Sequence, residues 1–242
     1  MAIPRLYIPV QISIGQTLSL SKDQSHYVES VLRLRAGSQL CLFDGAGGEY
    51  EGILETHPKQ TCRVLIKNFT EIECESPLRI TLVQGISKGE RMDYSIQKAV
   101  ELGVNAIIPV KCIRSQFSLQ GERLDRKVQH WQQIVIHACQ QSGRNRVPTV
   151  HGITPFVNLF SDCTNKQFFL LDPANSKQMK AITKPREEIF LLIGPEGGFD
   201  ENEIAVALTH GAQAIQLGPR ILRTETAGVA ALAAMQTLWG DF

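Results

Sequence analysis

Two short segments combine glycine, proline and charged residues directly after an apolar run. The first reads Leu191-Leu-Ile-Gly-Pro-Glu-Gly-Gly-Phe-Asp200, and the second reads Ile215-Gln-Leu-Gly-Pro-Arg-Ile-Leu-Arg-Thr-Glu-Thr-Ala227. Glycine permits backbone shapes that are closed to other residues, and proline fixes φ and removes a hydrogen-bond donor. Such segments can build a ligand site from backbone groups. Glu196, Glu225 and Arg223 are the side chains there that could take a proton or stabilise charge.

A tight strand-to-helix turn explains part of both segments. Asp200 with Glu203 predicts a capping box, and Thr224 is a candidate cap for the alanine-rich helix that follows. Glu196 could cap backbone donors of its own loop, and this alternative stays open. A turn alone does not explain a glutamate held between a proline and two glycines. Neither segment is a G-x-G-x-x-G or a P-loop, which disfavours dinucleotide and nucleoside triphosphate sites.

A third glycine-rich segment, Asp44-Gly-Ala-Gly-Gly48, follows a short apolar run. A glycine loop after a strand is typical of phosphate or ribose binding only when a helix follows. Here the next residues, 49–54, are strand-like, and Asp-Gly between two strands is a hairpin signal. We therefore predict a hairpin turn.

Basic side chains gather locally in a chain that is otherwise nearly neutral. Residues 111–146 hold seven basic and two acidic side chains, whereas the whole chain carries a net charge of +1. Arg144 and Arg146, in a Gly-Arg-Asn-Arg loop, are candidates for contact with a polyanion, as are Lys88 and Arg91. Arg123, Arg126 and Lys127 precede Trp131 at helical spacing and are better explained as a solvated helix face.

Composition excludes several classes of protein. The chain has 242 residues and a mass of 26.9 kDa, which fits one large domain or two small ones. Its near-neutral charge excludes a globally basic binder, and no apolar run is long enough for a transmembrane helix. The start lacks the pattern of a signal peptide. Six cysteines without a C-x-x-C pair, and six histidines without metal-ligand spacing, favour reduced thiols, no metal site and a cytoplasmic location.

The elements that must position these residues fall into two groups. Short strand-like runs and one helical stretch at 26–34 occupy residues 1–72, which predicts a small β-barrel. From residue 78 onward, apolar strands (80–83, 106–110, 168–171, 189–193, 214–217) alternate with amphipathic helices (92–102, 124–141, 202–210, 224–238). This alternation predicts an α/β domain over 73–242 with a parallel sheet covered on both faces. Ligand sites in such sheets lie at the carboxyl ends of the strands.

The paired glycine–proline loops resemble those of the SPOUT superfamily of knotted RNA methyltransferases. Within it, the chain resembles the ribosomal RNA small subunit methyltransferase E family, which modifies N3 of a uridine in 16S rRNA. The resemblance covers nearly the whole chain and includes Lys88-Gly-Glu-Arg-Met-Asp, Gln97-Lys-x-x-Glu101-Leu-Gly103 and Gln141-Ser-Gly-Arg144. The chain departs from the family pattern at Gln140 and at Ile113, where the family commonly has glutamate.

The resemblance implies a C-terminal SPOUT-type parallel sheet with a trefoil knot and an N-terminal PUA-like β-barrel. It also implies S-adenosylmethionine as cofactor, 16S rRNA within an assembled small ribosomal subunit as substrate, and a homodimer that does not involve a membrane. Arg144, Glu196 and Arg223 are then the expected catalytic residues. Expected to hold the cofactor, mainly through backbone groups, are Leu170, Leu171, Ile193, Gly194, Pro195, Glu196, Gly197, Leu217, Gly218, Ile221, Leu222 and Thr224. Expected to contact RNA are Arg5, Arg33, Lys88, Arg91, Arg114, Arg144 and Arg146.

Two other functions are open to the same sequence. A non-catalytic RNA-binding module would use the barrel alone and would have no affinity for the methyl donor. A SPOUT methyltransferase could also act on another RNA position, because no local motif specifies N3. A nucleotide-dependent oxidoreductase is disfavoured, since it would need a G-x-G-x-x-G at the first strand-to-helix turn.

Overall fold

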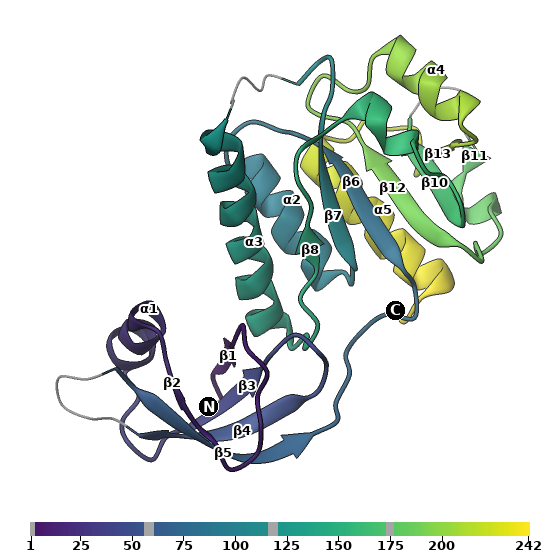
Figure 1. Ribbon diagram of the computed structural model, residues 1–242. Helices are drawn as coiled ribbons and strands as arrows, with labels where there is room; N and C mark the ends of the chain where they lie inside the picture. Colours follow the sequence, from purple (N-terminus) through teal and green to yellow (C-terminus); the bar gives the residue numbers. More distant parts are fainter. Residues whose placement is uncertain (1–2, 56–60, 116–120, 173–176) are drawn as a thin grey trace. The chain divides into compact units, whose positions relative to one another are not determined.

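The computed structural model describes residues 3–55, 61–115, 121–172 and 177–242, which form two compact units (Figure 1). The first unit comprises Met1–Glu75 together with Cys139–Val147. The second comprises Ser76–Ala138 and Pro148–Phe242. The first unit therefore takes in a short segment that lies far along the sequence, which the predicted division after residue 72 did not include.

A curled five-stranded sheet forms the first unit, in the order β1-β3-β4-β5-β2. β1 runs parallel to β3, and the other pairs are antiparallel. The bounds are β1 Arg5–Tyr7, β2 Thr17–Ser19, β3 Gln39–Phe43, β4 Glu49–Glu55 and β5 Arg63–Thr70. Its core is aliphatic, with Leu42 and Val64 fully buried. The predicted hairpin at residues 44–48 is confirmed, because this segment joins β3 to the antiparallel β4.

One helical segment packs on this sheet, and it begins earlier than the sequence pattern predicted. Helix α1 (Lys22–His26) continues into a π-helical turn at Tyr27–Val31. Ser21 and Gln24 form a capping box that starts the helix. Val28 points into the core and is fully buried.

The second unit is built on a parallel sheet in the order β11-β13-β10-β12-β6-β7-β8, with the short β9 paired to β7. All of its pairs are parallel, as predicted. The central β6 and β12 are buried along nearly their whole length, which requires cover on both faces. The bounds are β6 Ile80–Gly85, β7 Ala106–Lys111, β8 Thr149–Val150, β9 Thr154–Pro155, β10 Lys166–Leu171, β11 Lys177–Gln178, β12 Glu188–Ile193 and β13 Gln213–Gln216.

The α-helices of this unit are α2 (Glu90–Glu101), α3 (Glu122–Ser142, whose residues from Cys139 onward belong to the first unit), α4 (Glu201–Thr209) and α5 (Thr224–Trp239). Helices α2 and α5 pack against each other. The sheet face that buries Phe168, Leu170 and Leu192 packs instead against Phe199 and Ala207, at α4 and the loop before it. None of the helices in the described ranges is long and apolar enough to span a membrane.

The chain crosses the sheet between β13 and α5. β13 pairs with β10 on one side of β12, whereas α5 begins beside the ends of β12 and β6. Residues 217–223 connect the two elements. The short segments that sequence patterning missed, β2, β8, β9 and β11, are two or three residues long and cannot show a period.

Leu170 tests the core of the second unit. Its side chain is fully buried, so Leu170→Ala should lower the free energy of unfolding by about 2–5 kcal/mol through lost burial and a residual cavity. Chemical denaturation measures this loss. Ile221→Ala is the control, because that side chain is 86% exposed and its removal should change stability by less than about 0.5 kcal/mol. Equal effects of the two variants would contradict this assignment.

Candidate functional site

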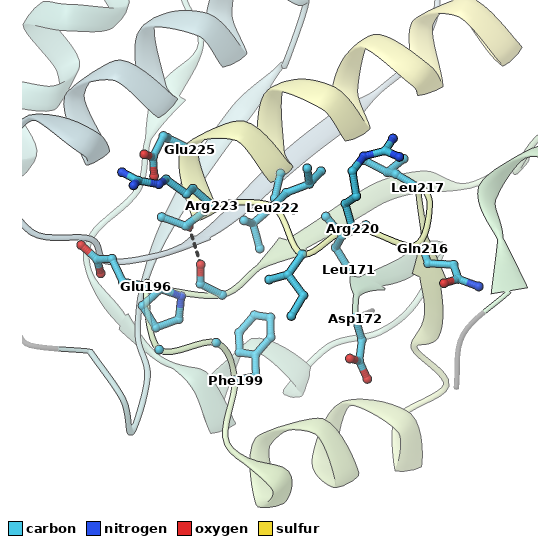
Figure 2. Close-up of a pocket in the computed structure, with 18 of the residues that line it drawn as sticks. Leu171, Asp172, Glu196, Phe199, Gln216, Leu217, Arg220, Leu222, Arg223 and Glu225 are labelled. Carbon is cyan, nitrogen blue, oxygen red and sulfur yellow. Dashed lines mark hydrogen bonds between the residues drawn. The ribbon is translucent and has the colours of Figure 1, made fainter. Parts of the chain in front are cut away.

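A cavity of about 460 Å³ opens at the carboxyl edge of the parallel sheet (Figure 2). Its walls come from the last residue of three strands and the segments that follow: residues 171–172 at the end of β10, residues 193–199 at the end of β12, and residues from 216–227, which run from the end of β13 into α5. Arg91 and Ile204 complete it. Both glycine–proline segments of the sequence therefore meet at one site.

The cavity has an apolar interior and a charged rim. Leu171, Ile193 and Leu222 supply aliphatic surface to it, and Phe199 adds an aromatic ring. The charged groups are Arg91, Asp172, Glu196, Arg220, Arg223 and Glu225. A cavity of this size, with apolar walls and a few polar groups, suits a small organic ligand.

The wall after β12 is fixed by close packing of backbone on backbone. A Cβ added at Gly85, the last residue of β6, would lie 2.5 Å from the Pro195 nitrogen. Gly194 is similarly confined, since an added Cβ would lie 3.0 Å from the Phe199 nitrogen. Gly198 has a φ of +70°, a backbone conformation that residues other than glycine rarely adopt.

The predicted capping box at the end of this wall is confirmed. Asp200 accepts a hydrogen bond from the Asn202 N–H, and the Glu203 carboxylate accepts one from the Asp200 N–H. Glu203 is buried, and its other oxygen accepts a bond from the Ile113 N–H at 2.8 Å. This bond uses the backbone of Ile113, so it does not depend on the side chain at that position.

The expectation that Thr224 caps α5 is wrong. The N-cap residue is Arg223, whose side chain makes no capping hydrogen bond, and Thr224 is the first residue of the helix. The Thr224 hydroxyl instead donates to the Gly194 carbonyl at 2.5 Å, the dashed line in Figure 2. This bond joins the segment after β12 to the segment after β13.

Glu196 is occupied by its surroundings. Its carboxylate accepts hydrogen bonds from the Lys88 N–H at 2.8 Å and from the Arg91 guanidinium at 3.2 Å. Partial burial by itself would raise the pKa of Glu196. The bonds from the Lys88 N–H, its own N–H and Arg91 outweigh burial, so that the net pKa is lowered. A carboxylate with a lowered pKa is a weak base at neutral pH.

Glu225, Arg220 and Arg223 differ from Glu196 in having side-chain atoms that are not engaged by described neighbours. The Oε2 atom of Glu225 is shielded from solvent and accepts no hydrogen bond from any described residue, although its side chain lines the cavity. Arg220 and Arg223 are exposed at the cavity, and neither pairs with a described residue. These three side chains are therefore available to a ligand.

All residues predicted to hold the cofactor, except Leu170, line the cavity. Leu170 does not, because strand alternation turns its side chain into the core. Sequence reasoning missed Asp172, Phe199 and Gln216, which also line the cavity. The signal that could have found them was position, because Asp172 directly follows β10, Phe199 ends the first glycine–proline loop and Gln216 directly precedes the second. A role for any of these residues in binding stays a prediction.

Two arginines predicted to contact RNA are engaged by partners within the first unit, where Arg5 is partly buried and Arg144 is buried. The Arg5 guanidinium pairs with Glu49, donates to the Asn145 side chain at 2.5 Å and stacks over Phe43. Arg144 is 3% exposed and forms an ion pair with Glu75 through two of its nitrogens. In this structure both guanidinium groups serve internal partners, because a buried charge must be paired.

The remaining predicted RNA contacts are exposed. Arg33 and Arg146 lie on the first unit, and Arg146 pairs with Glu73 at 2.8 Å. On the second unit, the exposed residues are Lys88, Arg91 and Arg114. Arg114 donates to the Gly197 carbonyl and to Asp200, both at 3.3 Å, beside the cavity wall.

The departure at Gln140 also has a structural account. Its side-chain amide donates to the Arg5 carbonyl at 3.0 Å within the first unit. A glutamate at this position, when ionised, could not donate this bond.

The family models match both parts of the chain. A model described as "RNA methyltransferase domain" matches residues 74–236, and one described as "RNA methyltransferase PUA domain" matches residues 20–67. The chain is 37% identical to ribosomal RNA small subunit methyltransferase E of Buchnera aphidicola, over 99% of this chain and 95% of that one. The protein of the same name from Bacillus subtilis is 31% identical over 93% and 91%.

Solved structures agree with these matches. The ribosomal RNA small subunit methyltransferase E of Neisseria gonorrhoeae, solved with S-adenosylmethionine bound, has a TM-score of 0.93 and 41% identity over the whole of both chains. A methyltransferase structure from Legionella pneumophila, solved with the cofactor SAM, has a TM-score of 0.96 and 38% identity over the whole of both chains. The fold predicted from the sequence, a SPOUT-type sheet preceded by a PUA-like unit, is confirmed. On these matches and on the two glycine–proline loops that meet at one cavity, the chain belongs to the ribosomal RNA small subunit methyltransferase E family.

Proposed function

We propose that this protein is an S-adenosylmethionine-dependent methyltransferase that methylates N3 of a uridine in 16S rRNA. The observation that carries this proposal is the cavity walled by the two glycine–proline loops. Two structures that match the whole chain were solved with the methyl donor bound. The uridine and its N3 atom follow from membership of the family.

The cavity fits the donor in size and chemistry. Its volume of about 460 Å³ lies within the usual range for small-molecule sites. Leu171, Ile193 and Leu222 offer an apolar surface to the purine ring, and the backbone of Gly194 and Gly218 can approach the ligand closely. The unpartnered Glu225 oxygen is an acceptor that a donor group of the bound ligands or substrate would satisfy.

The reaction is a displacement at carbon. S-adenosylmethionine supplies an electrophilic methyl group on a sulfonium, and N3 of the uridine attacks that carbon. N3 carries a proton at neutral pH, which must leave before or during the attack. The protein must therefore hold the base in line, accept this proton and stabilise negative charge on the uracil oxygens.

Of the two glutamates that line the cavity, Glu225 is better suited to accept the proton. The Glu196 oxygens are engaged by Lys88 and Arg91, and its lowered pKa weakens it as a base. Glu225 has an oxygen without a described partner. Arg223, exposed and unpaired among the described residues, is suited to stabilise a uracil oxygen. Glu196 then serves to hold the segment that carries Lys88 and Arg91.

The substrate and assembly complete the proposal. The PUA-like unit and the exposed Arg33 and Arg146 supply RNA contacts on the first unit, and Lys88, Arg91 and Arg114 supply them beside the cavity. We propose that the protein acts as a homodimer on 16S rRNA within an assembled small subunit, in the cytoplasm. Binding should weaken steeply with salt, since phosphate contacts release counterions.

Gly218→Val tests the donor site directly. An added Cβ at Gly218 meets nothing within 4 Å, so the protein should fold normally while the branched side chain obstructs the cavity. We expect donor binding, measured by calorimetry, to be abolished. Gly194→Val should also abolish it, but there an added Cβ lies 3.0 Å from backbone and could perturb the wall itself. Wild-type donor affinity in a folded Gly218→Val protein would contradict the placement of the donor, and no donor binding by the wild-type protein would leave the non-catalytic RNA-binding module as the better function.

Glu225→Gln distinguishes the roles of the two glutamates in the cavity. This variant keeps the shape of the side chain but is a very poor base, so kcat should fall by on the order of 10²–10⁴-fold while donor affinity is retained. Glu196→Gln is the matched control and should have the smaller effect on kcat. Methyl transfer to small subunits, with quantification of N3-methyluridine, measures both. A wild-type rate for Glu225→Gln would rule out its role as the base.

Arg144→Ala tests the predicted role of this residue on the RNA substrate. Methylation should fall by about 10²-fold or more, with donor affinity retained. Mixing this variant with Gly218→Val should restore activity if heterodimers contain one intact composite site. Glu75→Gln is the control, because it keeps the Arg144 charge but neutralises its partner. Equal losses of activity and melting temperature in Arg144→Ala and Glu75→Gln would assign Arg144 a structural role, as would normal methylation by Arg144→Ala.

A further inference from the structure

Gln84 is a polar side chain in an apolar place. It lies in β6, directly after Leu82 and Val83, and is 0% exposed. Its Oε1 atom has no hydrogen-bond partner among the described residues. A buried unpaired carbonyl oxygen costs free energy, and an apolar side chain of the same length would avoid that cost. The amide must therefore be explained by what its nitrogen does.

The nitrogen of Gln84 begins a chain of hydrogen bonds that ends at the wall of the cavity. Nε2 donates to the Thr224 hydroxyl oxygen at 3.0 Å and to the Gly85 carbonyl at 3.1 Å. The Thr224 hydroxyl donates to the Gly194 carbonyl at 2.5 Å. A hydroxyl has one proton and a carbonyl only accepts, so the Thr224 oxygen must accept from the amide nitrogen. The orientation of the Gln84 amide follows from this.

Close packing leaves little freedom around this chain of bonds. A Cβ at Gly85 would lie 2.5 Å from the Pro195 nitrogen, so the end of β6 is in direct contact with the cavity wall. On the other side, a Cβ at Gly228 of α5 would lie 3.7 Å from the Gln84 oxygen and 3.8 Å from the Ile193 side chain. Gln84 thus lies where the ends of β6 and β12 and the start of α5 come together.

We propose that Gln84 is a positioning residue for methyl-donor binding, although it does not line the cavity. Its amide holds the Thr224 hydroxyl, the hydroxyl holds the Gly194 carbonyl, and the two walls of the cavity keep their relative placement. The inference rests on the proposed function, since it takes the ligand of this cavity to be S-adenosylmethionine. It adds a residue from a strand that contributes nothing to the cavity surface.

The test compares donor affinity with stability in the full-length protein. Gln84→Met has a similar length but no donor, and Thr224→Val has a similar shape but no hydroxyl. Each should weaken S-adenosylmethionine binding, measured by calorimetry, by roughly three- to tenfold, the range expected for one hydrogen bond. The double variant should bind S-adenosylmethionine about as well as the single variant with the lower affinity, because either change breaks the same chain of hydrogen bonds. Thr224→Ser, which keeps the hydroxyl, should bind more tightly than Thr224→Val.

Gln236→Met is the matched control. Gln236 is also 0% exposed and hydrogen bonded, to Ser76 and to the Leu102 carbonyl, but it lies outside the cavity. Its replacement should lower the melting temperature and leave donor affinity within about twofold of wild type.

Three results would overturn the inference. One is wild-type donor affinity in Gln84→Met, and another is equal donor affinity in Thr224→Ser and Thr224→Val. The third is a loss of affinity in Gln236→Met that matches that of Gln84→Met at similar melting temperatures, since general destabilisation would then explain both. A wild-type protein that binds no S-adenosylmethionine would instead overturn the proposed function, and this inference with it.

Discussion

Contact between two backbones without an intervening side chain is the constraint on which the site depends. Gly85 at the end of β6 lies against Gly194 and Pro195 so closely that a Cβ would come within 3 Å of both. Parallel strands bring their carboxyl ends to one edge, where no regular ladder continues. Glycine and proline let the chain turn there, so the wall of the cavity is backbone at these positions. The Thr224 hydroxyl then secures this wall to α5.

Some charged groups around the cavity form ion pairs that hold its loops, although the paired arginines remain about half exposed. Arg91 pairs with Glu196, and Arg114 pairs with Asp200, so these cations hold the loop after β12 in place. Hydrogen bonds to the carboxylates, from the Asn202 N–H and Arg114 for Asp200, lower the pKa of both acids. Both carboxylates therefore stay ionised well below neutral pH, and the loop keeps its ion pairs at neutral pH.

In the first unit, two arginines that resemble RNA-binding residues in sequence are used for internal contacts. Arg5 and Arg144 carry the charge expected of RNA-binding residues, yet each lies in a network of internal partners. Moving a guanidinium out of water costs free energy unless ion pairs and hydrogen bonds replace its hydration. Removing one partner of such a pair leaves the other charge without compensation. These networks also fix the segment from Cys139 to Val147 in the first unit, which no local pattern in that segment indicates.

The sequence by itself determined the order and type of the longer elements, because period and apolar content are local properties. The sequence also identified the two glycine–proline loops as candidate ligand-binding segments, because few other structures require glycine, proline and charged residues together directly after a strand. Only the tertiary structure decided which side chains meet. The pairing of Arg144 with Glu75 spans 69 positions, and that of Gln84 with Thr224 spans 140. It decided that Leu170 belongs to the core and Leu171 to the cavity, and that Thr224 bonds to Gly194 and does not cap its own helix. Such contacts depend on where distant strands end in space, and local sequence carries no record of that.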